Sequence, residues 1–206
     1  LVRTLDGERR GSLLHLLDDT KTAMGARALR ARLLEPLTDV ERIRRRHDAV
    51  ELFVQDPRSR DQARAHLSEI GDIERLAVRT AVGLATPRDL GVIRNSLRAA
   101  KALHAELCAR PGGELDDALS ALQNADLCED VLRRLESALV PEPPTIDRQG
   151  GIFAAGYLEE LDELRALSTT AKDVVLDLER RERERTGIGS LKVKFTKVFG
   201  YYIEIT

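Results

Sequence analysis

The chain has 206 residues, which is enough to bury a substantial core in one large domain or two small ones. Its net charge of −2 excludes a general attraction to nucleic acid or membranes, so any such affinity must come from a local patch. Charged residues make up 33% of the chain and aromatic residues only 3%, a balance that favours amphipathic helices. No apolar run approaches the ~20 residues of a membrane span, and no signal peptide is predicted.

Eight helices are predicted in the first part of the chain, because apolar residues recur there at helical spacing. Typical N-cap residues precede several of them, including Ser12, Asp39 and Asp72, and Pro36 ends one. The stretch VPEPPTIDRQGG then predicts a loop over residues 140–151. The eight predicted helices cover residues 12–19, 22–34, 40–54, 57–71, 73–82, 87–108, 115–123 and 127–139.

After this loop, residues 157–185 contain no Pro or Gly and predict one helix of about 29 residues, roughly 43 Å long. From Glu179 onward the helix is polar on all sides, which is typical of a segment that leaves its core and forms an arm. The apolar stripe that precedes this point consists of Leu158, Leu161, Leu164, Leu167, Ala171, Val174 and Leu178.

The last seventeen residues, SLKVKFTKVFGYYIEIT, differ from the rest because they alternate like two strands and carry four of the seven aromatic residues. They predict a β-hairpin with Val193 and Phe195 on one face of the first strand, and Lys192 and Lys194 on the other. An isolated hairpin is marginally stable in water. We therefore expect this one to need further sheet or a partner surface, to be the least stable part of the chain, and to belong to a longer protein.

Catalytic and metal-binding patterns are not predicted in this chain. It has no G-x-x-x-x-G-K-[ST] loop, and its four histidines lack i, i+4 histidine partners. Cys108 and Cys128 are isolated, as expected of two reduced thiols in a cytosolic protein. We predict no catalytic residue, no cofactor-binding residue and no metal ligand, and therefore no enzyme activity of this chain alone.

Basic residues are concentrated between Glu179 and Lys197, where seven Lys and Arg residues accompany three glutamates. One interpretation is a solvated helix face with intrahelical ion pairs, followed by lysines that protect an edge strand. The other is a tip that binds DNA phosphates without sequence preference. Tyr201 and Tyr202 are likewise open to two interpretations, base stacking or packing across the strands. The candidate phosphate-binding residues are Arg185, Lys192, Lys194 and Lys197.

Five segments of the chain form a recognisable series. They are DDTKTAMGARALRARLLEPL (18–37), RHDAVELF (46–53), GDIERLAVR with ATPRDL (71–90), GGIFAAGYLEELDELR (150–165) and RTGIGSLKVKFTKVFGYYIEIT (185–206). In this order they resemble the MutS family of DNA mismatch-recognition ATPases. Two departures concern Arg32, where many relatives have Trp, and residues 194–196, where Lys-Phe-Thr replaces the more usual Gly-Tyr-Asn.

The resemblance implies a mainly α-helical fold that ends in a short β-hairpin. Residues 1–178 would form the helical core or lever domain, and residues 179–206 the lever tip and the start of the clamp domain. The lever would couple an ATPase domain to a clamp that encloses double-stranded DNA. Phe-x-Glu, the pair with which the family reads mismatches, does not occur in this chain.

The resemblance also concerns the parent protein. It implies ATP and Mg²⁺ as cofactors of the parent, a homodimer, a MutL-type partner, contacts with other domains of the same chain, and a cytoplasmic location at the bacterial nucleoid. No membrane association is expected. The alternative hypothesis is a helical protein-interaction scaffold without a DNA role, whose arm dimerises and whose hairpin completes a sheet in trans.

Overall fold

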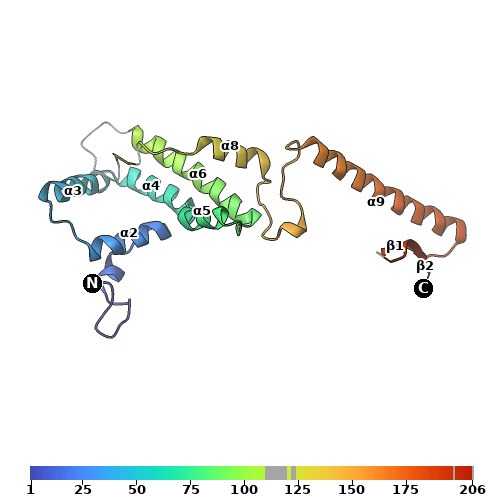
Figure 1. The fold of residues 1–206 in the computed structure, drawn as a ribbon, viewed down its shortest axis with the longest axis horizontal. Coiled ribbons are helices and arrows are strands. Elements are labelled where there is room, and N and C mark those ends of the chain that lie inside the picture. The colour runs from blue at the N-terminus through green and yellow to red at the C-terminus, as the bar shows by residue number, and fades with distance from the viewer. Residues whose placement is uncertain (110–119, 122–123, 197, 206) are drawn as a thin grey trace. The chain divides into compact units, whose positions relative to one another are not determined.

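The computed structural model describes residues 1–109, 120–121, 124–196 and 198–205 (Figure 1). The predicted fold class is confirmed, since helices dominate and the described strands form one short antiparallel hairpin near the C-terminal end. The chain divides into two compact units, residues 1–154 and residues 155–206. The predicted domain boundary at residue 178 falls inside the long helix of the second unit and stays a prediction.

The first unit contains the helices that the sequence predicted, apart from the one over 115–123, which lies largely outside the described residues. The 140–151 segment is a loop with one short 3-10 turn, as predicted. The elements are α1 (Leu13–Leu17), α2 (Ala23–Leu34), α3 (Val40–Gln55), α4 (Pro57–Glu69), α5 (Ile73–Ala81), α6 (Pro87–Cys108), α8 (Glu129–Ala138) and η1 (Asp147–Gln149).

Local side chains explain where these helices begin. The side chains of Ser12, Asp39 and Asp72 each accept a hydrogen bond from a backbone N–H in the first turn of α1, α3 and α5. Thr86 and Asp89 form a reciprocal capping box at the start of α6. These bonds satisfy N–H groups that have no partner within the helix. The starts were therefore readable from neighbouring residues alone.

Helix α6 is the centre of the first unit and packs against α4, α5 and α8. Leu103 and Leu107 on α6 form the core cluster with Ala63 of α4, and Phe53 and Leu67 pack around them. Ion pairs of 2.7 Å join α6 to α8, from Arg98 to Glu136 and from Lys101 to Glu129. Figure 1 shows these helices side by side.

Helix α2 has no buried residue, and charged side chains connect it to the rest of the first unit. Arg27 binds Asp72 through two hydrogen bonds of 2.8 and 2.9 Å, and its Nη2 also reaches Glu74 at 2.6 Å. Just before α2, Asp19 accepts a bond of 2.7 Å from Arg64 of α4. These contacts join α2 and its entry loop to α5 and α4.

The second unit consists of one long helix and the hairpin. Helix α9 (Glu159–Thr186) has 28 residues, about 42 Å at 1.5 Å per residue, and Gly187 ends it in the left-handed conformation. Strands β1 (Lys192–Thr196) and β2 (Gly200–Glu204) pair antiparallel, with Val193 opposite Ile203. Both the helix and the strand pairing follow the predictions.

The polar end of α9 has a contact that the sequence did not predict. The hairpin packs against this end of the helix. Glu179 and Arg183 use their polar groups there to bind the backbone of β1 and its approach. On the leucine-lined part, Leu164, Leu167 and Val174 are exposed, and its place in a core stays a prediction.

Candidate nucleic-acid interface

The hairpin is fastened to α9 by two residues one helical turn apart. Glu179 accepts a hydrogen bond of 2.9 Å from the backbone N–H of Val193, and Arg183 donates one of 2.6 Å to the carbonyl of Leu191. Glu179 and Arg183 also form an i, i+4 ion pair of 2.6 Å. Leu191, the residue that enters β1, is only 2% exposed. The attachment fixes the position of β1, and with it Lys192 and Lys194, relative to the end of the helix.

The remaining arginines near the end of α9 are paired within the helix. Arg180 and Arg181 both contact Asp177, at 2.5 and 2.6 Å. Arg185 lies 2.7 Å from Glu182, and hydrogen bonding to this carboxylate raises the pKa of Arg185. This arrangement corresponds to the interpretation as a solvated, ion-paired helix face. A phosphate would have to compete with Glu182 for Arg185.

The two lysines of β1 differ in their partners. Lys192 stands directly opposite Glu204 in the register, yet the Glu204 carboxylate contacts Lys194, which lies diagonally across the strands. Hydrogen bonding to Glu204 raises the pKa of Lys194. Within the described part of the chain, Lys192 forms no ion pair, and its side chain is exposed. Lys192 is therefore the predicted residue whose charge is most available to a phosphate.

Two aromatic residues of the hairpin pack against each other across the strands. Phe195 and Tyr201 face each other in the register, with ring centroids 5.1 Å apart and planes inclined by 58°. Such tilted pairs are a common way for aromatic rings to stabilise a hairpin. Both rings are nevertheless mostly exposed, at 60% and 64%, and Ile203 beside them is exposed as well. This exposed apolar face agrees with the expectation that the hairpin needs further sheet or a partner surface.

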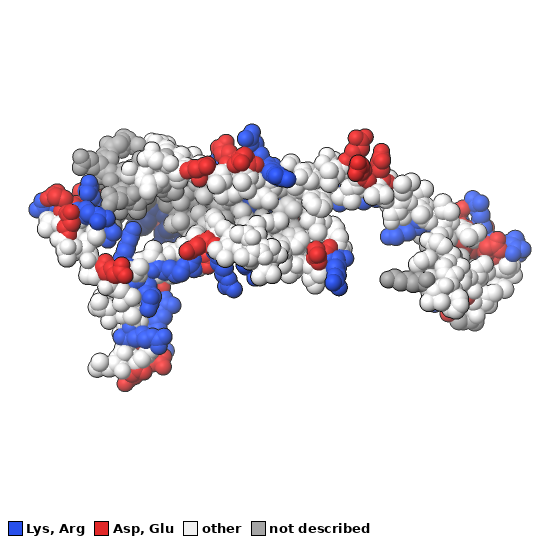
Figure 2. All heavy atoms as spheres, in the orientation of Figure 1, with Lys and Arg blue, Asp and Glu red and all other residues white. Residues whose placement is uncertain are grey.

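The predicted site residues are thus brought to one end of the second unit without forming a common cluster. Arg185 lies in the last turn of α9, whereas Lys192 and Lys194 lie on one face of β1. Lys197 is outside the described residues. On the face drawn in Figure 2, blue and red side chains of the described residues lie next to each other at this end of the second unit, without a continuous basic patch.

Sequence reasoning missed the roles of Glu179 and Arg183, which it had grouped with the charges of the tip. Both hold β1 in place, and neither was predicted to contact the hairpin. Their i, i+4 spacing places them on one helix face, which was the available signal. The partners of that face depend on how the chain turns back at Gly187, and no pattern in the helix reveals this.

Other kinds of site are not seen in the part of the chain that the structure describes. No three His, Cys, Asp or Glu side chains gather there in a group that could hold a metal ion. His66 lies 3.6 Å from Glu106, and His104 lies beside the Cys108 sulfur. None of the described helices is both long enough and apolar enough to cross a membrane. The expectation of no catalytic or metal residue stays a prediction.

Comparison with known proteins gives the family. Residues 1–197 match the family model described as MutS domain III. The chain belongs to this family. A DNA mismatch repair protein MutS from Salinibacter ruber is 48% identical over 209 residues, and one from Sorangium cellulosum is 45% identical over 231 residues. A third, from Methanococcoides burtonii, is 41% identical over 208 residues.

These relatives are much longer than the chain. The matches cover 100% of the chain but only 22% of the Salinibacter ruber protein, 25% of the Sorangium cellulosum protein and 23% of the Methanococcoides burtonii protein. The chain therefore spans about a quarter of the length of the curated relatives that it matches. The family membership confirms the resemblance seen in the five sequence segments.

Proposed function

We propose that this member of the MutS domain III family is the lever of a mismatch repair protein, and that its hairpin is the root of a clamp that contacts duplex DNA. The attachment of β1 to α9 through Glu179 and Arg183 is the observation that carries this proposal. A lever must transmit motion to its tip, and a hairpin fastened at two points follows the helix as one piece. The continuous 28-residue helix supplies the rod.

Contact with DNA is proposed through backbone phosphates at the hairpin. Lys192 is the leading residue, because it is exposed and has no ion-pair partner among the described residues. Lys194 and Arg185 are secondary, because Glu204 and Glu182 already offset their charges. Lys197 remains a candidate from its sequence position. Contacts of this kind give affinity that depends on salt and not on base sequence.

The test replaces Lys192 by glutamine in the full-length protein. Glutamine is preferable to glutamate, because a glutamate there would stand directly opposite Glu204 and weaken the hairpin by like-charge repulsion. Loss of one phosphate contact should weaken binding to matched and mismatched duplex alike. It should also reduce the slope of log K against log salt by about 1. Fluorescence anisotropy over a salt series measures both quantities.

Lys172→Gln is the matched control, since Lys172 is an exposed lysine of α9 outside the candidate site. It should leave affinity and salt slope unchanged. If Lys192→Gln behaves like Lys172→Gln at low salt, the assignment of Lys192 is wrong. A loss confined to mismatched duplex would contradict a backbone contact, because phosphates carry no sequence information.

The proposal extends to the parent protein through the family. We propose a DNA-dependent ATPase that uses ATP and Mg²⁺ in another domain, works as a homodimer with a MutL-type partner, and acts in the cytoplasm at the nucleoid. The chain itself would then hydrolyse no ATP. A phosphate-release assay on the chain and on the full-length protein tests this, and hydrolysis by the chain alone would contradict it.

A second candidate function is an interaction scaffold. The exposed apolar face of the hairpin, with Phe195, Tyr201 and Ile203, favours this alternative because such a face could complete a sheet with a second copy. Light scattering across a concentration series separates the two proposals. A stable dimer of the 206-residue chain supports the scaffold, whereas a monomer with weak, salt-sensitive DNA binding supports the lever.

A further inference from the structure

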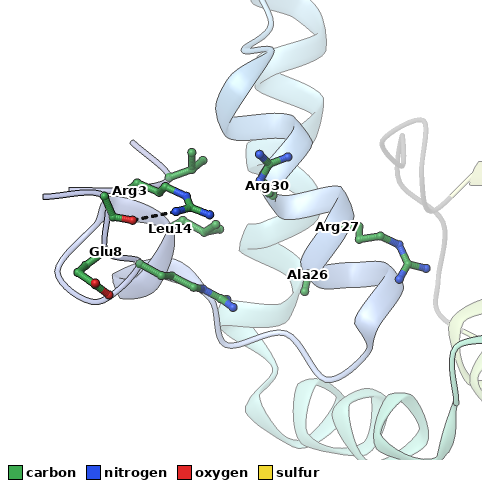
Figure 3. Close-up of a pocket in the computed structure, with 9 residues that line it drawn as sticks. Arg3, Glu8, Leu14, Ala26, Arg27 and Arg30 are labelled. Atoms are coloured by element: carbon green, nitrogen blue, oxygen red, sulfur yellow. Dashed lines mark hydrogen bonds between the residues drawn. The ribbon is translucent and has the colours of Figure 1, made fainter. Parts of the chain in front are cut away.

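A cavity of about 570 Å³ lies in the first unit, far along the chain from the hairpin, between the loop of residues 1–11 and helix α2 (Figure 3). Four arginines line it, namely Arg3 and Arg9 from the loop and Arg27 and Arg30 from α2. Figure 3 shows Arg3 reaching across from the loop toward the part of α2 that carries Arg30. This concentration of guanidinium groups is unexpected in a chain whose net charge is −2.

Two of the four arginines are already neutralised. Arg9 contacts Asp18, and Arg27 binds both Asp72 and Glu74. Arg3 donates a hydrogen bond of 3.0 Å to the carbonyl of Gly7, which carries no charge. Arg30 forms no ion pair within the described residues, and neither does Arg3. The cavity thus holds two guanidinium groups whose charges are not compensated by a carboxylate partner.

The residues around the cavity in the sequence do not neutralise this excess of positive charge. Residues 1–34 contain seven Lys and Arg residues and four Asp and Glu residues. Glu8 also lines the cavity, but Figure 3 shows it on the side of the loop away from α2. A planar guanidinium offers its donors in a fork that matches the two oxygens of a carboxylate or phosphate. An anionic group is therefore the chemistry that Arg3 and Arg30 recognise best.

The apolar part of the cavity indicates which anion fits. Val2, Leu14 and Ala26 line it beside the arginines. Leu14 is buried, and its N–H donates a bond of 3.0 Å to the carbonyl of Leu1, which holds the start of the loop against α1. Val2 and Ala26 are partly exposed and form the open apolar part of the wall. A free phosphate or a DNA backbone has no apolar group for such a surface, whereas a protein segment with both Leu and Glu does.

We propose that this cavity is a docking site for an acidic, partly apolar protein segment. One carboxylate of the segment would bind both Arg3 and Arg30, and adjacent apolar side chains would cover Val2 and Ala26. The contact between the carboxylate and the two arginines would fix the position of the segment, and the apolar contact would supply much of the affinity. This site is independent of the DNA contact proposed for the hairpin.

The experiment uses a fluorescently labelled ten-residue peptide in which two glutamates are flanked by leucines, titrated with the 206-residue chain. Replacing both glutamates by glutamines should weaken binding about tenfold, because charge-assisted hydrogen bonds are lost. The double variant Arg3→Gln/Arg30→Gln should weaken binding of the glutamate peptide by a similar factor. Arg30→Lys keeps the charge but loses the forked donors of the guanidinium. Its affinity for the glutamate peptide should therefore lie between that of the unchanged chain and that of the double variant.

Arg10→Gln is the matched control, since Arg10 is an exposed arginine of the same loop that does not line the cavity. It should bind the peptide as the unchanged chain does. Circular dichroism shows whether each variant keeps its helix content. Equal affinity for the two peptides, or equal affinity of the double variant and Arg10→Gln, would overturn the proposal. Displacement of the peptide by inorganic phosphate or by a short duplex at equal charge concentration would also overturn it, and would indicate a phosphate site.

Discussion

The Glu179 carboxylate accepts a hydrogen bond of 2.9 Å from the backbone N–H of Val193, fourteen residues further along the chain. Glu179 is held in turn by Arg183, which also binds the carbonyl of Leu191. A single turn of α9 therefore offers an acceptor and a donor to two backbone groups near the start of β1. This contact joins the helix and the hairpin, whose two strands alone would be marginally stable.

Removal of the Glu179 carboxylate should loosen this junction. In Glu179→Ala, the N–H of Val193 loses its charged acceptor, which is worth about 1.5 kcal/mol for a partly buried group. Amide hydrogen exchange at Val193 should then be about tenfold faster, whereas exchange in α6 should not change. Glu182→Ala is the control, because Glu182 pairs with the exposed side chain of Arg185. Equal exchange at Val193 in the two variants would show that the hydrogen bond does not hold the hairpin.

The same experiment tests the expected stability order of the chain. The hairpin has an exposed apolar face around Phe195 and Tyr201, whereas Leu103 and Leu107 of α6 lie in the core cluster. Exchange of hairpin amides should therefore be faster than exchange in α6, even in the unchanged chain. Protection in β1 and β2 equal to that in α6 would contradict this expectation.

Local chemistry made much of the fold predictable from the sequence. Asp39, Asp72 and Thr86 fix helix starts through bonds to residues two or three positions away, so their effect is visible in the sequence. The pairing of Val193 with Ile203 follows from strict alternation on both sides of one turn. These features depend on contacts that are short in sequence.

The functions of individual charges were not predictable in the same way. Arg94 and Arg98 lie one turn apart on α6, and nothing in the sequence separates them. The structure buries Arg94 to 5% exposure against the carbonyls that follow α8, and leaves Arg98 in an exposed ion pair. In the candidate site, the sequence does not distinguish Lys192 from Lys194. The register places Glu204 opposite Lys192, yet the Glu204 carboxylate pairs with Lys194. Such choices depend on partners that are distant in sequence.

Arg94 is expected to be the most important charged residue for the stability of the first unit. Its guanidinium donates to the carbonyls of Val140 and Pro141, at 2.8 and 2.5 Å, and so holds the start of the 140–151 loop at the end of α8. Arg94→Met would leave these carbonyls without their charged donor. We expect a loss of about 2 to 3 kcal/mol in the free energy of unfolding, measured by urea denaturation.

Arg98→Met provides the comparison, because it removes an arginine four residues further along the same helix. Its ion pair with Glu136 is exposed, so the loss should stay within about 0.5 kcal/mol. If both variants lose the same stability, the hydrogen bonds of Arg94 to the loop do not have the role assigned to them.

Gly71 is required by the close approach of α6. A Cβ atom at this position would lie 2.6 Å from Cγ1 of Val92, and the N–H of Gly71 already donates to the buried hydroxyl of Ser96 at 2.9 Å. Gly71→Ala should therefore cost about 1 to 3 kcal/mol of unfolding free energy through overpacking. Val92→Ala in the same chain removes the clashing methyl, so the double variant should lose less than the sum of the single losses.

Gly189→Ala is the control for the glycine substitution, since a Cβ atom there meets no neighbour within 4 Å and no positive φ is required. It should be neutral or slightly stabilising, because alanine restricts the unfolded chain. Additive losses in the Gly71→Ala/Val92→Ala double variant would rule out the proposed clash.

Asp72 should make the first unit sensitive to acid. Hydrogen bonds from Arg27 lower the pKa of Asp72 to about 2, although partial burial opposes this change. The unfolded carboxyl titrates near 3.9, so the native contact adds stability that is fully present above about pH 4 and is lost as the pH falls toward 2.

Replacement of Asp72 by asparagine separates its charge from its capping role, because asparagine caps helices as well as aspartate does. The pH dependence of unfolding free energy between pH 4 and 2 should be flatter in Asp72→Asn than in the unchanged chain, as measured by urea denaturation at each pH. Asp39→Asn tests a cap of α3 that forms no ion pair within the described residues, and it should retain more of the acid sensitivity. If the pH dependence of unfolding free energy is reduced equally in both variants, the contact between Arg27 and Asp72 is not the source of the acid sensitivity.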